Sequence, residues 1–227
     1  MISAAVLCPH PPLLLPGLGG AVDPVEALRA AAVAAVRAAT SGAARVVAVG
    51  GHEEPGQWDD ALPVDVRRFG TTDPPPSRPA LPLSLGVAKR LLCDAGWSGP
   101  VELVTVPWHA DRRRVEALAA ELADRPDGTA LLLLGDGSTR RGDRAPGYLD
   151  ERAFGFDDAV AKALADGDAQ ALRDLDVGLA EELMVLGSAA FRVLGAVAAH
   201  QRVQPRATLT YRDDPFGVSY YVATWAF

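Results

Sequence analysis

The chain has 227 residues, of which 49% are hydrophobic and 22% are charged, a balance that is typical of a folded globular protein and excludes a disordered one. Its net charge of −7 argues against electrostatic binding to nucleic acid or to an anionic membrane, and no stretch approaches the roughly 18 apolar residues of a membrane span. The apolar N-terminal run has no Lys or Arg before it and is broken by prolines, so it does not resemble a signal peptide. Cys8 and Cys93 lie far apart and in no CxxC pattern, which predicts buried thiols in a reducing compartment and therefore a cytoplasmic protein.

Apolar runs and turn signals predict strands that alternate with helices along the chain. The first helix is expected to begin with Asp23 as its N-cap and Pro24 in its first turn. A Pro-rich stretch at 70–82 is typical of a surface loop. Gly96 is expected to end the helix predicted at 84–95. In chain order the sequence predicts strands at 2–7, 45–49, 101–106, 130–134, 206–211 and 218–225, and helices at 24–39, 84–95, 112–123, 151–165 and 177–199.

This order of elements predicts an α/β fold in a single domain that covers residues 1–227. The last two strands follow each other without a helix, so we expect a central mixed β-sheet with helices on both faces. In open α/β sheets, ligands bind beyond the carboxyl ends of the strands. The functional site is therefore expected at that edge of the sheet.

Four predicted strands run directly into turns that carry polar side chains. His10 follows the first strand, His52 the second and His109 the third, while Asp136 and Ser138 follow the fourth. If these strands are parallel, their carboxyl ends gather three of the four histidines at one edge. This convergence is the main functional signal in the residues themselves.

The segment around His10 suits a metal ligand, because Pro9 and Pro11 stiffen the backbone on either side of the imidazole. A turn histidine in a Pro-rich loop is the alternative. Two histidines and a carboxylate suit non-haem iron(II), and zinc accepts the same set. Within the predicted helix 177–199, Glu182 borders an apolar stripe and is the candidate carboxylate. The alternative is that Glu182 pairs with an arginine.

Several motifs resemble the class III extradiol ring-cleaving dioxygenase superfamily, in particular the catalytic-subunit (LigB-like) family and its Memo-like relatives. They are the CPHPP opening at 8–12, the Gly51-His52 turn and the DPFGV run at 214–218, which Tyr220 and Tyr221 follow. The segment at 156–168 and the helix that carries Glu182 also look like their counterparts in that family. The resemblance covers most of the chain.

This resemblance implies a mixed α/β fold with Fe(II) bound by His10, His52 and Glu182. Enzymes of the family bind a catecholic diol to the iron, activate O2 beside it and open the ring next to the two hydroxyls, with the metal acting as template and Lewis acid. The implied partners are a small aromatic substrate and O2. A homo-oligomer is compatible with the sequence.

One departure from the family concerns the proton carrier. Family enzymes carry a catalytic histidine in the turn after the fourth strand, but here residues 135–139 read GDGST. Asp136 from this turn, or His109 from a neighbouring strand end, could take over proton transfer. Both assignments remain hypotheses at this point.

The same turn supplies candidate substrate-binding residues. Arg140 and Arg141 suggest an anionic substrate held by a guanidinium group, although solvated loop arginines have the same pattern. Aromatic residues near the C-terminus either line an aromatic pocket, together with Trp108, or belong to the ordinary core. The candidate substrate-binding residues are Ser138, Thr139, Arg140, Phe216 and Tyr220.

Three functions therefore stay open. The first is a metal-dependent dioxygenase-like oxidoreductase that acts on a small aromatic diol. The second is a catalytically degenerate relative that keeps the fold and binds a metal or ligand in a regulatory role. The third is a metal-assisted hydrolase, which would need the same ligands and an activated water.

Overall fold

A computed structural model describes the whole chain except residues 21, 67–68 and 70–78. The predicted Pro-rich loop at 70–82 lies largely outside the described residues. The six predicted strands and four of the five predicted helices are each present as one element, with ends shifted by a few residues. Within the described part of the chain, no helix is long and apolar enough to cross a membrane.

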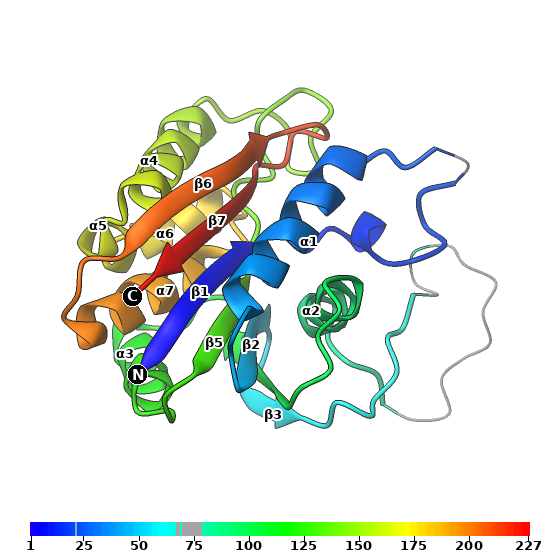
Figure 1. Ribbon diagram of the computed structural model, residues 1–227. Coiled ribbons are helices and arrows are strands. Elements are labelled where there is room, and N and C mark those ends of the chain that lie inside the picture. The colour runs from blue at the N-terminus through cyan, green and yellow to red at the C-terminus, as the bar shows by residue number, and fades with distance from the viewer. Residues whose placement is uncertain (21, 67–68, 70–78) are drawn as a thin grey trace.

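Seven strands form one mixed sheet at the centre of the molecule (Figure 1). In chain order they are β1 (Ile2–Cys8), β2 (Arg45–His52), β3 (Gly56–Trp58), β4 (Val101–Pro107), β5 (Thr129–Leu134), β6 (Arg206–Asp213) and β7 (Tyr220–Ala226). Their order across the sheet is β3-β4-β2-β5-β1-β7-β6. The neighbours β4, β2, β5 and β1 are parallel, whereas β3, β7 and β6 pair in antiparallel fashion at the two sides. The predicted mixed sheet is confirmed.

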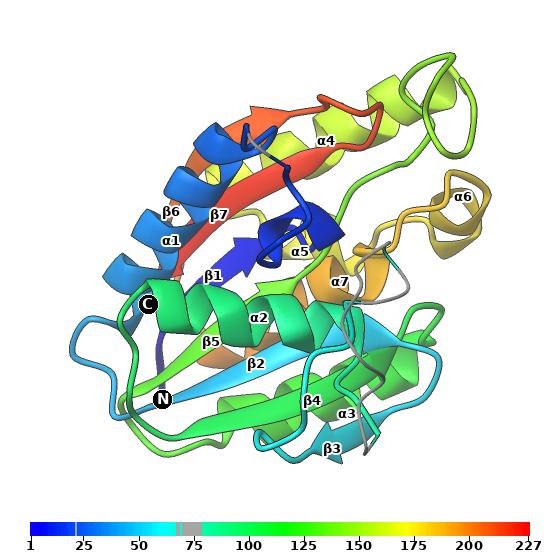
Figure 2. The same cartoon turned by 90° about the vertical axis from the view of Figure 1, so that its right-hand side faces the viewer.

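Helices cover both faces of this sheet, which is why the central strands are apolar throughout (Figures 1 and 2). The helices are α1 (Glu26–Thr40), α2 (Leu83–Asp94), α3 (Arg112–Ala123), α4 (Arg152–Asp166), α5 (Ala169–Arg173), α6 (Val177–Glu182) and α7 (Ser188–Gln201), with a short 3-10 turn, η1 (Pro12–Leu14). The first two helices lie on one face and the other five on the opposite face. Alternate residues of each central strand pack on the two layers: Val46 and Ala48 face α1 and α2, and Val47 and Val49 face α7.

The predicted helix at 177–199 is wrong, because the chain breaks there into α6 and α7. Met184 adopts a left-handed conformation with φ of 54°. Three residues later, the N–H of Gly187 donates to the carbonyl oxygen of Asp136 at 2.8 Å. This contact with the turn after β5 draws the chain off the helical path, and the new helix begins at Ser188.

Smaller differences have local causes. The first helix begins at Glu26 rather than at 24, since the Asp23 carboxylate accepts from the N–H of Val25 and pairs with Arg29 instead of capping a helix. The sequence did not predict β3 or α5. Both cysteines are free thiols, as expected, but only Cys8 is buried and Cys93 is exposed.

Candidate functional site

The carboxyl ends of β1, β5 and β2 lie in one row across the sheet. Leu134 of β5 is in register with Cys8 of β1 on one side and with Gly50 of β2 on the other. Neighbouring strands lie about 4.8 Å apart, so side chains that leave this row at the same level are close together. The residues that follow the row by two positions are His10, Asp136 and His52.

His10 and Asp136 form a buried pair at this edge. Only 4% of His10 and 7% of Asp136 is exposed. The backbone N–H of His10 donates to Asp136 Oδ1 at 2.7 Å, and the ring atom Nδ1 of His10 lies 3.3 Å from the same oxygen. The carboxylate therefore fixes the backbone of this histidine and lies beside its ring, without a hydrogen bond to Nδ1.

Two further elements hold Asp136 in place. A Cβ atom at Gly187 would lie 2.5 Å from the Asp136 carbonyl oxygen, so only glycine allows this approach of α7 to the turn. On the other side is Tyr220 of β7, whose hydroxyl pKa is raised by burial and, to a lesser degree, by the charge of Asp136. Asp136 is thus enclosed by three segments that are distant in the sequence.

His52 is partly exposed and has aromatic neighbours. Its ring lies edge-on to Trp58 with centroids 5.3 Å apart, and its centroid is 6.3 Å from that of Trp108. The backbone N–H of Glu54 approaches His52 Nδ1 at 3.2 Å. The sequence analysis missed Trp58, because β3, the short strand that carries it, had no signal of its own.

The structure does not bring Glu182 to this site. Glu182 is the last residue of α6, its side chain is 61% exposed, and it pairs with Arg152 at 2.7 Å. The expectation that Glu182 borders a buried apolar stripe is wrong, because that stripe assumed one continuous helix through 183–187. The alternative of an arginine pair is what the structure shows.

The full ligand set implied by the resemblance therefore does not fit a metal ion in this structure. His10 has the surroundings of a metal-binding histidine, with a carboxylate beside one ring nitrogen. His52 ends β2, which β5 separates from β1, and it stands at the same level of the sheet. Among the described residues, however, no group of three or more His, Cys, Asp or Glu side chains is placed to hold a metal ion.

The turn after β5 is held mainly by internal bonds. Ser138 is fully buried, and its hydroxyl donates to the carbonyl of Leu183. Thr139 is buried with no partner for its hydroxyl, and the Nε atom of Arg140 is also buried without one. Of the candidate substrate-binding residues in this turn, Thr139 and Arg140 have side-chain polar atoms without a hydrogen-bond partner. The hydroxyl of Ser138 already has one.

Asp157 of α4 binds the same turn through hydrogen bonds. This carboxylate is fully buried and accepts from the N–H of Ser138 at 3.0 Å and from the Ser219 hydroxyl at 2.7 Å. Arg141 lies 3.5 Å from Asp157 and bonds Asp214 at 2.5 Å, so it is occupied by two carboxylates. Burial raises the pKa of Asp157, and its hydrogen bonds and Arg141 oppose that shift.

The candidate aromatic residues do not form one surface. Tyr220 and Tyr221 are buried core residues of β7, as the alternative interpretation held, and 39% of Phe216 is exposed. Trp108 packs against the backbone of Gly51, where a Cβ atom would lie 2.4 Å from its ring. Of the candidate aromatic residues, Trp108 is therefore the one that lies beside His52.

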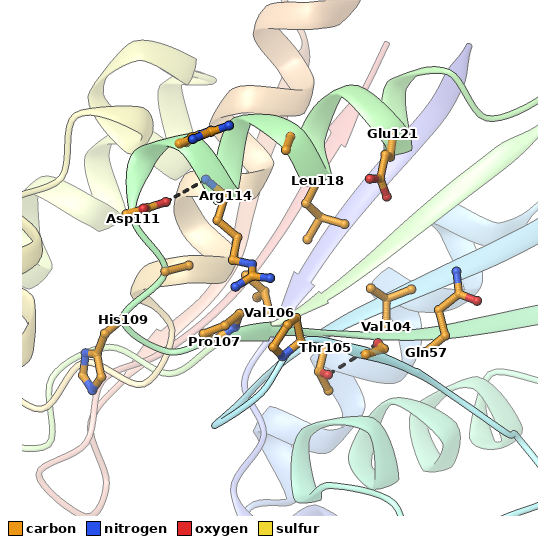
Figure 3. Close-up of a pocket in the computed structure, with 15 residues that line it drawn as sticks. Gln57, Val104, Thr105, Val106, Pro107, His109, Asp111, Arg114, Leu118 and Glu121 are labelled. Atoms are coloured by element: carbon orange, nitrogen blue, oxygen red, sulfur yellow. Dashed lines mark hydrogen bonds between the residues drawn. The ribbon is translucent and has the colours of Figure 1, made fainter.

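His109 lines a separate groove between α3 and the β3–β4 side of the sheet, with a volume of about 780 Å³ (Figure 3). The strand residues Val104 and Val106 form part of its lining and belong to the core on the α3 face. In Figure 3, His109 and Glu121 lie at opposite ends of the groove, and Arg114 reaches from α3 toward β4. The strand residues behind His10 and Asp136 pack on the opposite face of the sheet, so the groove is distinct from the buried pair.

Several buried polar atoms on the segments at the carboxyl edge of the sheet have no hydrogen-bond partner. In native proteins such atoms are few, and an unfilled one often marks the position of a water, an ion or a ligand. Among the described residues, such atoms on segments that follow β1, β4 and β5 or begin α7 are His10 Nδ1, Trp108 Nε1, Thr139 Oγ1, Arg140 Nε and Ser188 Oγ. These atoms include indole and guanidinium N–H groups, which only donate.

Comparisons with known proteins bear on the fold alone. No family model matches the chain, and no curated protein matches it. The chain is similar to a solved structure titled "Crystal structure of uncharacterized protein JW3007 from Escherichia coli K12", with a TM-score of 0.53 and 15% sequence identity. The match covers 99% of this chain and 100% of the other.

Proposed function

We propose that this protein binds a small molecule at the carboxyl edge of β1, β5 and β2, and that it is a catalytically degenerate relative of the extradiol dioxygenases. The observation that carries this proposal is the buried His10–Asp136 pair, set among polar atoms that lack partners. Because two of those atoms, Trp108 Nε1 and Arg140 Nε, only donate, we expect the ligand to carry acceptor oxygens such as those of a carboxylate or a diol.

Two features argue against ring opening. The implied carboxylate ligand Glu182 pairs with Arg152 in solvent, and the turn at 135–139 has no histidine to carry a proton. Asp136 in that turn is buried, and its Oδ1 atom accepts the N–H of His10. A dioxygenase would lack two of the groups that its chemistry requires.

Ring opening of a catecholic diol with Fe(II) and O2 is the second candidate, and one observation favours it. His10 and His52 both stand two residues beyond one row of the sheet, and His10 has the carboxylate neighbour that metal-binding histidines commonly have. Zinc in the same place would serve a hydrolase or a binding role. For either candidate, we also propose that the protein is cytoplasmic and associates with copies of itself.

The two candidates separate in an oxygen-uptake experiment with protein loaded anaerobically with Fe(II). The substrates are catechol and benzoic acids that carry two adjacent hydroxyls. We expect no oxygen uptake above that of free iron, but saturable binding of at least one compound by calorimetry. His10→Ala should weaken that binding at least tenfold, and His200→Ala, at the far end of α7, should leave it unchanged.

Glu182→Gln makes the distinction sharper. Because Glu182 faces Arg152, we expect this variant to keep the wild-type iron content and the wild-type affinity for the bound compound. Oxygen uptake that disappears in both His10→Ala and Glu182→Gln would restore the dioxygenase and overturn the degenerate assignment. A protein that binds none of these compounds and consumes no oxygen would remove both candidates.

A further inference from the structure

Strand β6 forms one edge of the sheet (Figure 1), and among the described strands only β7 pairs with it. It has eight residues, and its central stretch at 207–211, ATLTY, has no charge and no proline. The free N–H and C=O groups of an edge strand can pair with another strand, and charged residues or prolines commonly prevent this. The middle of β6 has neither form of protection.

The two ends of β6 carry opposite charges on the same face of the sheet. Arg206 stands opposite Ala226 of β7, and Asp213 stands opposite Tyr220. Ala226 and Tyr220 are six residues apart in a strand without irregularity, so both lie on one face. Arg206 and Asp213 are seven residues apart, which would put them on opposite faces of a regular strand. Thr210 has no partner in the register, and this extra residue, a β-bulge, brings the two charges to the same face.

Neither of these charges forms an ion pair within the described part of the chain. Arg206 and Asp213 are both exposed, and Asp213 accepts hydrogen bonds only from a neighbouring hydroxyl and a neighbouring backbone N–H. Arg212, the other charged residue of β6, differs, because it pairs with Asp158 of α4. The charges of β6 that remain available for a partner are therefore the two at its ends.

From this geometry we infer that two copies of the chain associate through β6, in antiparallel fashion and around a two-fold axis perpendicular to the sheet. Such an axis joins each face of the sheet to the same face of the second copy. It places Arg206 of each copy opposite Asp213 of the other, so the interface contains the same charge pair twice. This inference rests on the self-association proposed above and deepens it, because it names the contacting surface.

The charges at the two ends also select this arrangement against others. A parallel pairing in register would bring like charges together at both ends, which is destabilising. A shift of the antiparallel register by two residues would leave both charges of each copy without a partner. A bulge commonly protects an edge strand, but here it makes one antiparallel register complementary, because it puts Arg206 and Asp213 on one face.

Sedimentation velocity over a range of protein concentrations measures this association, and we expect the wild type to form a dimer. Arg206→Glu places like charges opposite each other at both ends, so it should weaken the dimer about tenfold or more. Asp213→Arg should have the same effect with the signs reversed. The double variant with Arg206→Asp and Asp213→Arg restores opposite charges and should recover the wild-type dimer.

Arg113→Glu is the matched control, since it makes the same change of charge at an exposed arginine of α3, beside the β3–β4 side of the sheet. It should leave the dimer unchanged, and circular dichroism should show every variant folded. A wild type that stays monomeric at every concentration would overturn the inference. So would a dimer that neither single substitution weakens, or a loss that the double variant does not reverse. Each of these results leaves ligand binding at His10 unaffected, because the calorimetry described above measures it separately.

Discussion

At the scale of single residues, His10 shows how a sequence motif becomes a fixed side chain. Prolines on both sides restrict its backbone, and its own N–H is bonded to Asp136. A residue whose backbone is restricted in this way, and whose side chain is buried, loses little conformational entropy when it binds a ligand. That entropy is lost earlier, during folding, when β1 packs between β5 and β7 and brings His10 to its place.

The two cysteines differ sharply in environment and should differ in reactivity. Burial raises the pKa of the Cys8 thiol far above its usual range, so it has almost no thiolate at neutral pH. Cys93 is exposed. We expect a disulfide reagent such as DTNB to modify one thiol of the native protein, and two after unfolding in guanidinium chloride. Cys93→Ser should abolish the fast reaction, and rapid labelling of both thiols in the native state would contradict the burial of Cys8.

Asp157 predicts a pH dependence of stability. Its pKa is raised by folding above the ordinary value of about 3.9, so its contribution to stability is fully present below that pH and is lost as the pH rises through the folded-state pKa. Asp157→Asn cannot ionise. The free energy of unfolding of the wild type, measured relative to this variant by urea titration, should therefore fall from about pH 3 upward and then level off. A difference that rises with pH would show that the bonds from Ser138, Ser219 and Arg141 outweigh the cost of burial.

At the scale of elements, α7 shows how close packing opposes helix propensity. Gly195 lies inside this helix, where alanine is favoured over glycine by about 1 kcal/mol. A Cβ atom there would lie 2.5 Å from the carbonyl oxygen of Ala169 in α5, and overpacking of this kind costs about 1 to 3 kcal/mol. Gly195→Ala should therefore destabilise the protein by up to about 2 kcal/mol in chemical denaturation.

Gly155 in α4 is the matched control. No atom lies within 4 Å of a Cβ built at this position, so only the helix propensity changes. Gly155→Ala should stabilise the protein by about 0.5 to 1 kcal/mol. If both substitutions stabilised the protein, the close approach of α5 to α7 would be refuted.

The elements also show what the sequence can predict of this fold. Apolar runs located the six long strands, and the glycines and prolines between them located most ends, because those signals are local. The break between α6 and α7 was not predictable in this way. It depends on a hydrogen bond from Gly187 to Asp136, which lies far away in the sequence.

The candidate site divides along the same line. The positions of His10, His52 and Asp136 followed from strand ends, which parallel pairing places at one edge. The position assumed for Glu182 followed from helical periodicity carried past a break, and it failed with the helix. His109 follows β4, but it lines the groove against α3 rather than the buried pair. Asp157 has no local signal that distinguishes it from the exposed Asp158 beside it.

At the scale of the whole molecule, the buried pair depends on segments from across the chain. His10 follows β1, Asp136 follows β5 and Tyr220 begins β7, and α7 supports the turn that carries Asp136. The site is therefore no more stable than the sheet as a whole. A substitution that loosens β7 should weaken ligand binding together with global stability, since no smaller unit holds these side chains.

The position of β1 has a consequence for the synthesis of the protein. This apolar strand is made before the other strands of the sheet, yet both of its neighbours, β5 and β7, are made much later. At ordinary rates of translation, roughly 10 to 40 seconds separate β1 from β7. During that interval β1 has at least one unpaired edge, and we expect chaperones at the ribosome to bind the nascent chain. Because the site needs β7 in place, a nascent chain should bind ligand at His10 only after β7 has been made.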